Sequence, residues 1–498
     1  MQTISLKHPD RFFINGVWTP PSSDATVEVL SSSTEELFVR VAEAQEEDVN
    51  RAVAAARKAF DDGPWPRLSH RERAAYLCAI GEEMDKRVAD QAILLTQESG
   101  VIKSVSDAMS AALGDVFRYY ASLAETYVFE EERQPGPGSG NVGLLVREPV
   151  GVVAAIVPWN APAFLMAYKS APALLAGCTV IIKASPEAPA AGYVLAEIAE
   201  KVGLPPGVLN ILTADREVSE MLVRHPDVDK VTFTGSTAAG RKIGAICGER
   251  IARCTLELGG KSAGVILDDT DVEAAAKTIS GWAGFLTGQA CSSLTRIIVS
   301  QNRHDAFADA LAAAFSATKV GDPFDPTTQM GPLAIARQRD RVEHYIQQGK
   351  AEGAKLLTGG GRPIGIKKGY FVEPTVFSNV SNDHVIAREE IFGPVLSVIP
   401  AKDEEDAIRI ANDSNYGLNA SVFTNDVDRA YAVARRLRSG TVGHNSFRTD
   451  FHIAFGGFKQ SGIGREGGTE GLAPFLETKT ILLDAYPSQY PKAKTSKL

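Results

Sequence analysis

A cysteine among small residues is the first candidate for chemistry in this chain. Cys291 lies in TGQACSSLTR, where Ala290, Ser292 and Ser293 leave room for a substrate around its sulfur. A thiol acts as a nucleophile only when it is accessible and close to a base or a positive dipole that favours its deprotonation. Free cysteines are more often small buried hydrophobic residues, so this stretch alone leaves both interpretations open.

Two further polar residues stand at the ends of apolar runs. Glu257 lies in TLELGGK, directly before two glycines, where burial would disfavour its charged form and suit it to act as a general base. Asn160 lies in VPWNAP, and its carboxamide N–H could stabilise a developing oxyanion. A glutamate that caps a turn and an asparagine that caps the following helix are the alternatives.

The stretch FTGSTAAG, residues 233–240, could bind a phosphate. Gly235 permits a tight turn, and a helix beginning near Ser236 offers free backbone N–H groups to an anion. The stretch lacks the common GxGxxG pattern, and a plain turn capped by Ser236 is the alternative. Lys183, which closes the run TVIIK, could donate hydrogen bonds to a ribose or phosphate, or could simply be solvated.

The elements that position these residues alternate regularly over residues 150–260. Apolar runs that are continuous, and rich in valine and isoleucine, are typical of strands buried on both faces of a parallel sheet. Helical stretches lie between the runs, which predicts a doubly wound α/β domain that binds ligands beyond the carboxyl ends of its strands. The predicted strands are GVVAAIVP, TVIIK, VLNIL, KVTFTG and CTLEL.

The remaining chain divides around this domain. Residues 46–126 have helical spacing, and the alternation resumes after Gly260 as a second α/β unit that runs to about residue 464. The linker QPGPGSG, residues 134–140, breaks the pattern before the strand-like VGLLVREPVG. The late stretch ETKTILLDAY predicts a strand with no local partner, which can complete a sheet elsewhere, including in a neighbouring subunit.

Composition excludes several classes of function. A chain of 498 residues needs two or three domains, and a formal net charge of −9 disfavours general binding to nucleic acid or anionic membranes. We expect no membrane span and no secretory signal. Five scattered cysteines predict neither disulfides nor a metal site, so a cytoplasmic setting is expected. The final Ser496-Lys497-Leu498 matches a peroxisomal targeting signal, which only a eukaryotic import receptor recognises.

Taken together, these stretches resemble the aldehyde dehydrogenase superfamily over nearly the whole chain. They occur in the order usual in that family, and Glu257 precedes Cys291 by the customary 34 residues. The matching stretches are VPWNAP, IIKASPEAP, FTGSTAAG, LELGGKS, GQAC, EEIFGPV, NYGLNASVFT and FGGFKQSGIGREGG.

The resemblance implies a catalytic role for five residues. Cys291 would be the nucleophile that adds to the aldehyde carbon, and the Asn160 side chain with the Cys291 backbone N–H would bind the resulting oxyanion. Glu257 would activate the water that hydrolyses the later thioester. Lys169 and Glu477 match a lysine and a glutamate proposed to relay the proton outwards.

The resemblance also implies NAD or NADP as the cofactor. Lys183 and Glu390 match residues that hold the two riboses, and Phe392 matches an aromatic residue packed near the nicotinamide. Trp159 lies beside that ring, and Ser236 matches a pyrophosphate contact. The other expected cofactor contacts are Val157, Pro158, Ser185, Glu187, Gly235, Glu257, Leu258 and Gly259.

One departure from the family bears on the choice between the two cofactors. Many NAD-preferring members carry an acid three residues after the ribose-binding lysine, where it holds the ribose hydroxyls and repels a 2′-phosphate. This chain has Pro186 at that position and Glu187 directly after it. NAD is therefore favoured, and NADP stays possible.

The resemblance leaves the substrate least determined. Small residues after Asn160 and an aromatic loop at residues 445–455 favour a medium-chain, terpenoid or aromatic aldehyde, with Phe447, Phe451 and Ile453 making the outer end apolar. Arg448 could instead bind a carboxylate, as in semialdehyde dehydrogenases, and Ala454 replaces a common proline in this loop. The expected substrate contacts are Ala161, Phe164, Tyr168, Ala290, Ser292, Phe447, Phe451 and Phe455.

The resemblance further implies a three-part architecture. A cofactor domain would comprise residues 1–126 and 150–259, a catalytic domain residues 260–464, and a bridging oligomerisation element residues 127–149 and 465–498. This element would pair strands near 142–149 and 479–483 and build a homodimer or homotetramer. A variant that releases acyl-CoA would lack Glu257, and a non-catalytic relative would lack Cys291, Glu257 or Asn160, whereas this chain has all three.

Overall fold

Eight strands form the larger of two main sheets in the computed structural model, which describes residues 4–488. Their order is β19-β11-β10-β7-β8-β9-β1-β2, and the five strands from β11 to β9 are parallel. β7 to β10 are buried along their whole length, as their continuous apolar sequences predicted. The bounds are β1 (Phe12–Ile14), β2 (Val17–Thr19), β7 (Val152–Ile156), β8 (Thr179–Ala184), β9 (Leu209–Thr213), β10 (Lys230–Thr234), β11 (Arg253–Glu257) and β19 (Gly462–Ile463).

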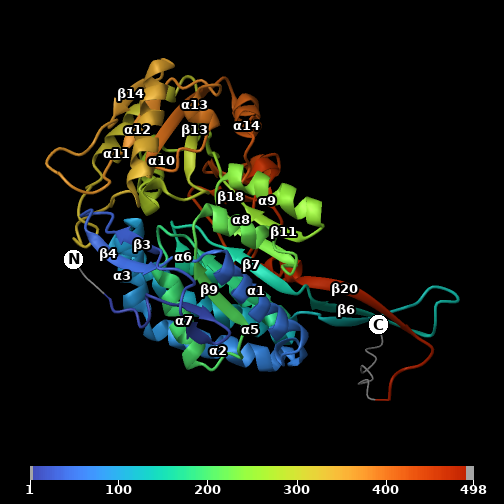
Figure 1. Cartoon of the computed structure of the whole chain (residues 1–498). Coiled ribbons are helices and arrows are strands. Elements are labelled where there is room, and N and C mark those ends of the chain that lie inside the picture. Colours follow the sequence, from blue (N-terminus) through green and yellow to red (C-terminus); the bar gives the residue numbers. More distant parts are fainter. Residues whose placement is uncertain (1–3, 489–498) are drawn as a thin grey trace.

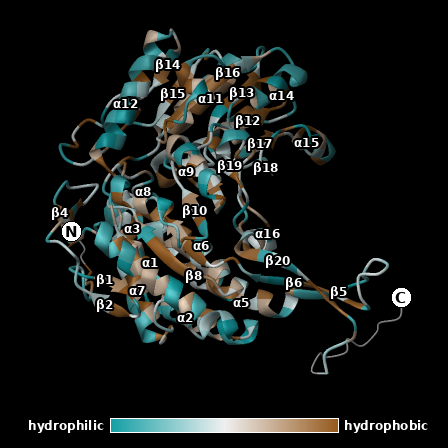
Figure 2. Ribbon diagram, turned by 45° about the vertical axis from the view of Figure 1, so that its right-hand side comes forward, coloured by the Kyte–Doolittle hydropathy of each residue, from teal (hydrophilic) through white to brown (hydrophobic). Residues whose placement is uncertain are grey.

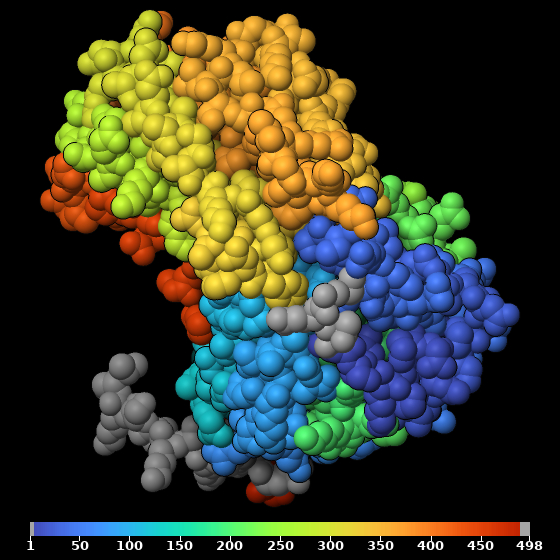
Figure 3. Space-filling model, turned by 90° about the vertical axis from the view of Figure 1, so that its left-hand side faces the viewer, coloured from blue at the N-terminus to red at the C-terminus, as the bar shows by residue number. Residues whose placement is uncertain are grey.

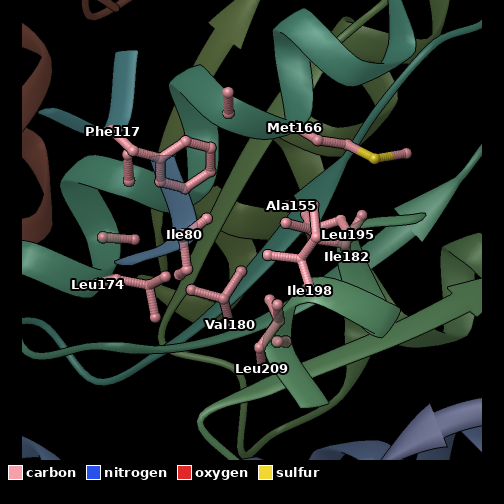
Figure 4. Close-up of a cluster of buried hydrophobic side chains, with 14 of the residues drawn as sticks. Ile80, Phe117, Ala155, Met166, Leu174, Val180, Ile182, Leu195, Ile198 and Leu209 are labelled. Atoms are coloured by element: carbon pink, nitrogen blue, oxygen red, sulfur yellow. The ribbon is translucent and has the colours of Figure 1, made fainter. Parts of the chain in front are cut away.

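Helices cover both faces of this sheet, which confirms the doubly wound α/β class. Alternate strand residues point to opposite faces: Val153 and Val180 pack under one set of helices, and Ala154 and Ile181 under the other. Figure 4 shows the first core, where Phe117 and Leu174 lie near Val180. One face carries α2 (His70–Lys86), α5 (Leu113–Thr126), α6 (Pro162–Ala176) and α7 (Ala190–Lys201); the other carries α1 (Glu46–Asp61), α8 (Arg216–Arg224) and α9 (Thr237–Arg250).

A second α/β unit contains seven strands in the order β14-β15-β16-β13-β12-β17-β18, all parallel except β14. The two units occupy opposite ends of the face shown in Figure 3, blue N-terminal residues at one end and yellow-to-orange residues at the other. The strands are β12 (Ser262–Ile266), β13 (Leu294–Ser300), β14 (Lys355–Thr358), β15 (Thr375–Ser378), β16 (Val395–Ala401), β17 (Asn419–Phe423) and β18 (Thr441–His444). The helices are α10 (Val272–Ala283), α11 (His304–Ser316), α12 (Ala336–Ala351), α13 (Val385–Arg388), α14 (Glu404–Asn412) and α15 (Val427–Ala434).

A three-stranded antiparallel sheet projects from the first unit (Figures 1 and 2). Its order is β20-β6-β5, and β20 (Leu476–Leu483) pairs with β6 (Val142–Pro149) over all eight residues. The late strand therefore finds its partner within the same chain. The linker at 134–140 connects β5 (Glu130–Arg133) to β6 as the loop of a hairpin, because its glycines and prolines suit a turn.

The sequence did not predict several edge elements. Two short pairs, β1 with β2 and β3 (Thr26–Leu30) with β4 (Leu37–Ala42), precede the first helix. β19 lies inside the stretch assigned to the second unit, yet it pairs with β11 of the first sheet. β1, β2 and β19 have only two or three residues each, which is too short to show a period in the sequence, whereas β3 and β4 have five and six. No helix within residues 4–488 is long and apolar enough to cross a membrane.

The packing in Figure 4 generates a prediction about stability. Phe117 on α5 is fully buried in the first core, so Phe117→Ala removes apolar contacts and leaves a cavity. We expect a loss of about 3–5 kcal/mol in the free energy of unfolding and a lower Tm by differential scanning fluorimetry. Val427→Ala, at a side chain that is mostly exposed, should leave Tm unchanged within error; equal shifts in both variants would contradict this packing.

Candidate active site

The predicted site residues converge at one edge of the first sheet. Asn160 follows β7, Lys183 lies near the end of β8, and Glu257 ends β11. Parallel strands have their carboxyl ends at the same edge, so these side chains gather there. Cys291 instead precedes β13 of the second sheet. A Cβ at Gly260 would overlap the Cys291 carbonyl oxygen, so the nucleophile loop lies directly against the chain that leaves β11.

The turn before Cys291 has an uncommon backbone. Leu286, Thr287 and Gly288 have consecutive positive φ angles of 49°, 56° and 72°. Left-handed conformations cost roughly 1–3 kcal/mol each for residues other than glycine and persist only where surrounding contacts hold them. The Gln289 side chain supplies such a contact, since its Nε2 donates to the Leu286 carbonyl oxygen at 3.0 Å.

Gln289 also ties this turn to the rest of the site. Its Oε1 accepts from the backbone N–H of Ala334 at 2.9 Å, and its Nε2 lies 3.3 Å from the carbonyl oxygen of Ser99. The Ser99 hydroxyl in turn donates to the Trp159 carbonyl oxygen at 2.7 Å. The end of α3 (Val88–Ser99) thus bridges the Trp159 loop and the nucleophile loop.

Asn160 points toward the nucleophile loop. Its Nδ2 donates to the carbonyl oxygen of Gln289 at 2.9 Å. The following helix α6 has Ala161 as its N-cap with no side-chain cap, so Asn160 does not have the capping role that was the alternative. An amide NH₂ has two donors, and the second hydrogen of Asn160 stays available for a ligand.

Glu257 is held in a dry position. Its side chain is 2% exposed, and neither carboxylate oxygen has a hydrogen-bond partner among the described residues. Burial raises its pKa well above the usual value, the charge of Glu466 raises it further, and Lys169 partly offsets both. A carboxyl group with a raised pKa accepts protons more readily, which suits a general base.

Lys169 pairs with Glu466 and not with the predicted Glu477. The Lys169 ammonium is fully buried, contacts the Glu466 carboxylate, and donates to Thr232 Oγ1 at 3.2 Å. Glu477 lies on β20, 44% exposed, and pairs with Arg253 Nε at 2.5 Å. The prediction that Glu477 acts beside Lys169 is therefore wrong in geometry, because β20 carries Glu477 out along the projecting sheet.

Glu466 was missed although the sequence contained a signal for it. The residue stands in FGGFKQSGIGREGG, one of the stretches that carried the family resemblance. Its backbone pairs with Phe455 in an isolated bridge, through hydrogen bonds of 2.6 and 2.7 Å. This bridge brings the carboxylate under the sheet edge beside Glu257, where it contacts Lys169.

Cys291 is half-buried, and its thiol lies among acidic groups. Burial raises its pKa, and the negative charges of Glu390 and Glu257 raise it further. Burial also raises the pKa of Glu390, to about 7, while the Gly260 N–H donates to this carboxylate at 3.1 Å. The backbone N–H groups of Cys291 and Ser292 lower the pKa of the Cys291 thiol and so favour its thiolate.

The predicted nicotinamide-side residues lie together. The rings of Trp159 and Phe392 meet edge to face with centroids 5.5 Å apart. Phe392 has a positive φ of 62°, and Gln338 Nε2 holds its carbonyl oxygen at 2.8 Å. A Cβ at Gly259 would come within 2.5 Å of the Glu390 carboxylate, so the chain after Glu257 lies directly against Glu390. Val157 and Pro158 follow β7, and Leu258 follows Glu257.

The adenosine-side residues surround the starts of α7 and α9. Ser236 caps α9 by accepting from the Ala239 N–H at 3.2 Å, as the plain-turn alternative expected, and Gly235 precedes it with the Phe233 ring packed closely. The Thr234 hydroxyl is buried and has no hydrogen-bond partner among the described residues.

The donors and acceptors at this end fit a dinucleotide. Burial lowers the pKa of Lys183 to about 8, opposed by Glu187 and Asp215. A buried cation, a helix N-terminus that Ser236 caps at one N–H, and an unsatisfied hydroxyl together match a ribose and a phosphate. Ser185 donates to the Glu187 carboxylate in the same loop.

Aromatic rings form two groups among the residues expected to contact the substrate. Phe164, Tyr168, Phe451 and Phe455 form one group with centroid separations of 4.3–5.0 Å. Phe447 belongs to a second group with Trp282 and Phe285, at 5.3 and 6.4 Å. Trp282 and Phe285, which the sequence did not single out, precede Cys291 and border an open hollow of about 550 Å³.

The other expected substrate contacts lie as follows. Ala161 and Ser292 are buried, and Ala290 is half-buried against Leu95 and Leu286. Ile453 is 69% exposed, so the prediction that it lines an apolar end is wrong. The loop turns there, because the Ile453 carbonyl packs against Gly468.

Comparison with known proteins shows the family of this chain. Residues 18–481 match the aldehyde dehydrogenase family, and the chain belongs to that family. It is 45% identical over 482 residues to geranial dehydrogenase of Castellaniella defragrans, covering 97% of this chain and 99% of that protein. A 3-succinoylsemialdehyde-pyridine dehydrogenase of a Pseudomonas species is 42% identical over 476 residues, covering 95% and 98%. The crystal structure of a Mycobacterium tuberculosis aldehyde dehydrogenase complexed with NAD+ superposes with a TM-score of 0.93 at 44% identity, covering 97% of this chain and 99% of that one.

The buried charges around Glu257 generate a prediction about pH dependence. Glu466→Gln removes a negative charge that raises the Glu257 pKa and leaves the charge of Lys169, which lowers it. We expect the rising limb of kcat against pH for hexanal oxidation to move to lower pH. Lys169→Met should move the same limb to higher pH.

A matched glutamate provides the control for this experiment. Glu477→Gln removes a carboxylate that is partly exposed and paired with Arg253, so its pH profile should coincide with that of the parent protein. A shift in Glu477→Gln with none in Glu466→Gln would contradict the assignment. Circular dichroism spectra of all three variants check that each is folded.

Proposed function

We propose that this protein oxidises an aldehyde to the carboxylic acid with NAD as the cofactor. The observation that carries the proposal is the convergence of Cys291, Asn160 and Glu257 where the two sheets meet. NAD is favoured because the ring pair, Lys183 and the start of α9 suit a dinucleotide, and because the M. tuberculosis relative was crystallised with NAD+.

Each residue has a defined part in this mechanism. The Cys291 sulfur adds to the aldehyde carbon, and the oxyanion that forms accepts hydrogen bonds from Asn160 Nδ2 and the Cys291 backbone N–H. When bound, NAD supplies a hydride acceptor and a positively charged ring. Oxidation of the thiohemiacetal leaves a thioester on Cys291.

Hydrolysis then depends on Glu257. Its carboxylate takes a proton from the water that attacks the thioester, and its raised pKa makes it a better proton acceptor than an exposed glutamate. Lys169 and Glu466 carry that proton away from the site, since the three groups form one buried cluster.

The substrate we propose is an apolar aldehyde of medium chain length, terpenoid or aromatic. The two groups of rings offer apolar walls on either side of the approach, and the relative from C. defragrans is named for geranial. Arg448 lies exposed on its loop, with its carbonyl oxygen held by Asn419. A site for a carboxylate-bearing semialdehyde is therefore the less favoured alternative.

We also propose the three-part division of the chain, with the projecting sheet as the oligomerisation element of a homodimer or homotetramer. Within residues 4–488, both outer strands of that sheet, β20 and β5, have a free edge, and such edges pair readily with another chain. We propose a cytoplasmic setting. The peroxisomal alternative depends on Ser496-Lys497-Leu498, which lies outside the described residues.

Turnover of hexanal tests the proposed chemistry. With NAD and without coenzyme A, the absorbance of reduced cofactor at 340 nm should rise for the parent protein and show a loss of at least 1,000-fold for Cys291→Ser. Cys78→Ser, at a half-buried cysteine far from the site, is the matched control. Equal rates for parent and Cys291→Ser would overturn the role of Cys291.

The aromatic walls predict chain-length dependence. Phe451→Ala removes a ring that contacts Phe164, Tyr168 and Phe455, and should raise KM for hexanal and geranial by about tenfold while barely changing KM for acetaldehyde. Ile453→Ala, on the same loop but exposed, should leave both values unchanged. Faster turnover of succinic semialdehyde than of hexanal in the parent protein would contradict the proposed substrate class.

A further inference from the structure

An ion pair joins the two α/β units at the adenosine end of the site. Arg337 Nη2 contacts Glu187 Oε1, and the Ser185 hydroxyl contacts the other carboxylate oxygen, Oε2. Glu187 lies in the loop between β8 and α7 of the first unit, whereas Arg337 lies in the first turn of α12 of the second. Both oxygens of the carboxylate are therefore held in place by neighbours from different units.

The surroundings of this pair match a place where a ribose binds. The Glu187 side chain is 15% exposed, and its charge acts on the buried ammonium of Lys183 at the end of β8. The Arg337 side chain is 56% exposed, so its guanidinium keeps donors that face solvent. A ribose held by Lys183 and Glu187 would lie within reach of those donors.

A single phosphate group distinguishes the two dinucleotides at this place. A ribose hydroxyl can donate to a carboxylate, whereas a 2′-phosphate carries about two negative charges and is repelled by it. A guanidinium has the opposite preference, because its planar donors bind phosphate in a bidentate manner. The pair therefore contains a carboxylate that favours NAD and a guanidinium that favours NADP. Because Pro186 occupies the position where many NAD-preferring members carry an acid, Glu187 is the acid of this loop.

We propose that Arg337 is a specificity-determining residue for the cofactor. It pairs with Glu187 and so orients the carboxylate that rejects a 2′-phosphate, and its guanidinium binds that phosphate once the carboxylate loses its charge. This inference rests on the proposed use of a nicotinamide dinucleotide, and it adds a residue that the family resemblance did not assign.

Equilibrium binding of nucleotide fragments tests this role apart from catalysis. Isothermal titration of the full chain with 5′-ADP and with 2′,5′-ADP should show weaker binding of the 2′-phosphate for the parent protein. Glu187→Gln should strengthen 2′,5′-ADP binding by at least about tenfold, the size expected of one charge-assisted bidentate contact. Adding Arg337→Ala to Glu187→Gln should remove the gain, and Arg337→Lys should keep part of it.

The controls separate this inference from the proposed function. Glu343 and Arg362 form a comparable exposed pair on and beside α12, so Glu343→Gln should change binding of neither fragment. If Glu187→Gln gains no affinity for 2′,5′-ADP, or if the gain survives Arg337→Ala, the role of Arg337 is overturned while 5′-ADP binding still supports the dinucleotide site. If the parent protein binds neither fragment nor NAD, the proposed cofactor and this inference fail together.

Discussion

The hydrogen bonds of one buried amide hold the active site together. Gln289 bonds to Leu286 within its own turn, to Ala334 in the second unit and to Ser99 at the end of α3. Its backbone oxygen meanwhile accepts from Asn160. Asn160 follows a strand of the first sheet and Cys291 precedes a strand of the second, so their separation depends on bonds that cross between the sheets. The residues before Gln289 have left-handed backbone conformations, which persist only where surrounding contacts hold them. The hydrogen bonds of Gln289 are such contacts.

Burial of charge is the second constraint on the site. Glu257, Glu466 and Lys169 bring two acids and one base into a region without water-exposed surface, so the cluster favours holding a proton. Burial also raises the pKa of the Cys291 thiol, and the charges of Glu390 and Glu257 raise it further.

The sequence allowed the fold class and the central residues to be predicted, and the reasons are physical. β7 to β10 are continuous apolar runs with no alternation, a pattern that few arrangements other than a buried parallel sheet produce. Asn160 follows β7 by four residues and Glu257 ends the parallel strand β11, at the sheet edge where the topology brings side chains together.

Contacts between distant segments could not be predicted in the same way. Glu466 and Glu477 lie eleven residues apart, and only the bridge to Phe455 decides which of them reaches Lys169. Arg337 meets Glu187 across 150 residues, and Ile453 turns outward through a loop with no periodic pattern. The spacing of apolar residues indicates which face of a helix or strand is buried. It does not indicate which loop lies opposite that face.

Segments near the two ends of the chain form the two edges of the same sheet, so this sheet can be completed only late in synthesis. β1 and β2 occupy one edge of the eight-stranded sheet, while β19, at residues 462–463, covers the other edge at β11. During synthesis, β11 leaves the ribosome roughly 200 residues before β19, the strand that pairs with it. This is a delay of about 10–40 s at ordinary rates of translation. Throughout that interval a nascent first unit presents an unpaired strand edge, the kind of surface that promotes aggregation and recruits chaperones. The second unit is translated entirely within this interval, so it can fold before the first sheet is complete.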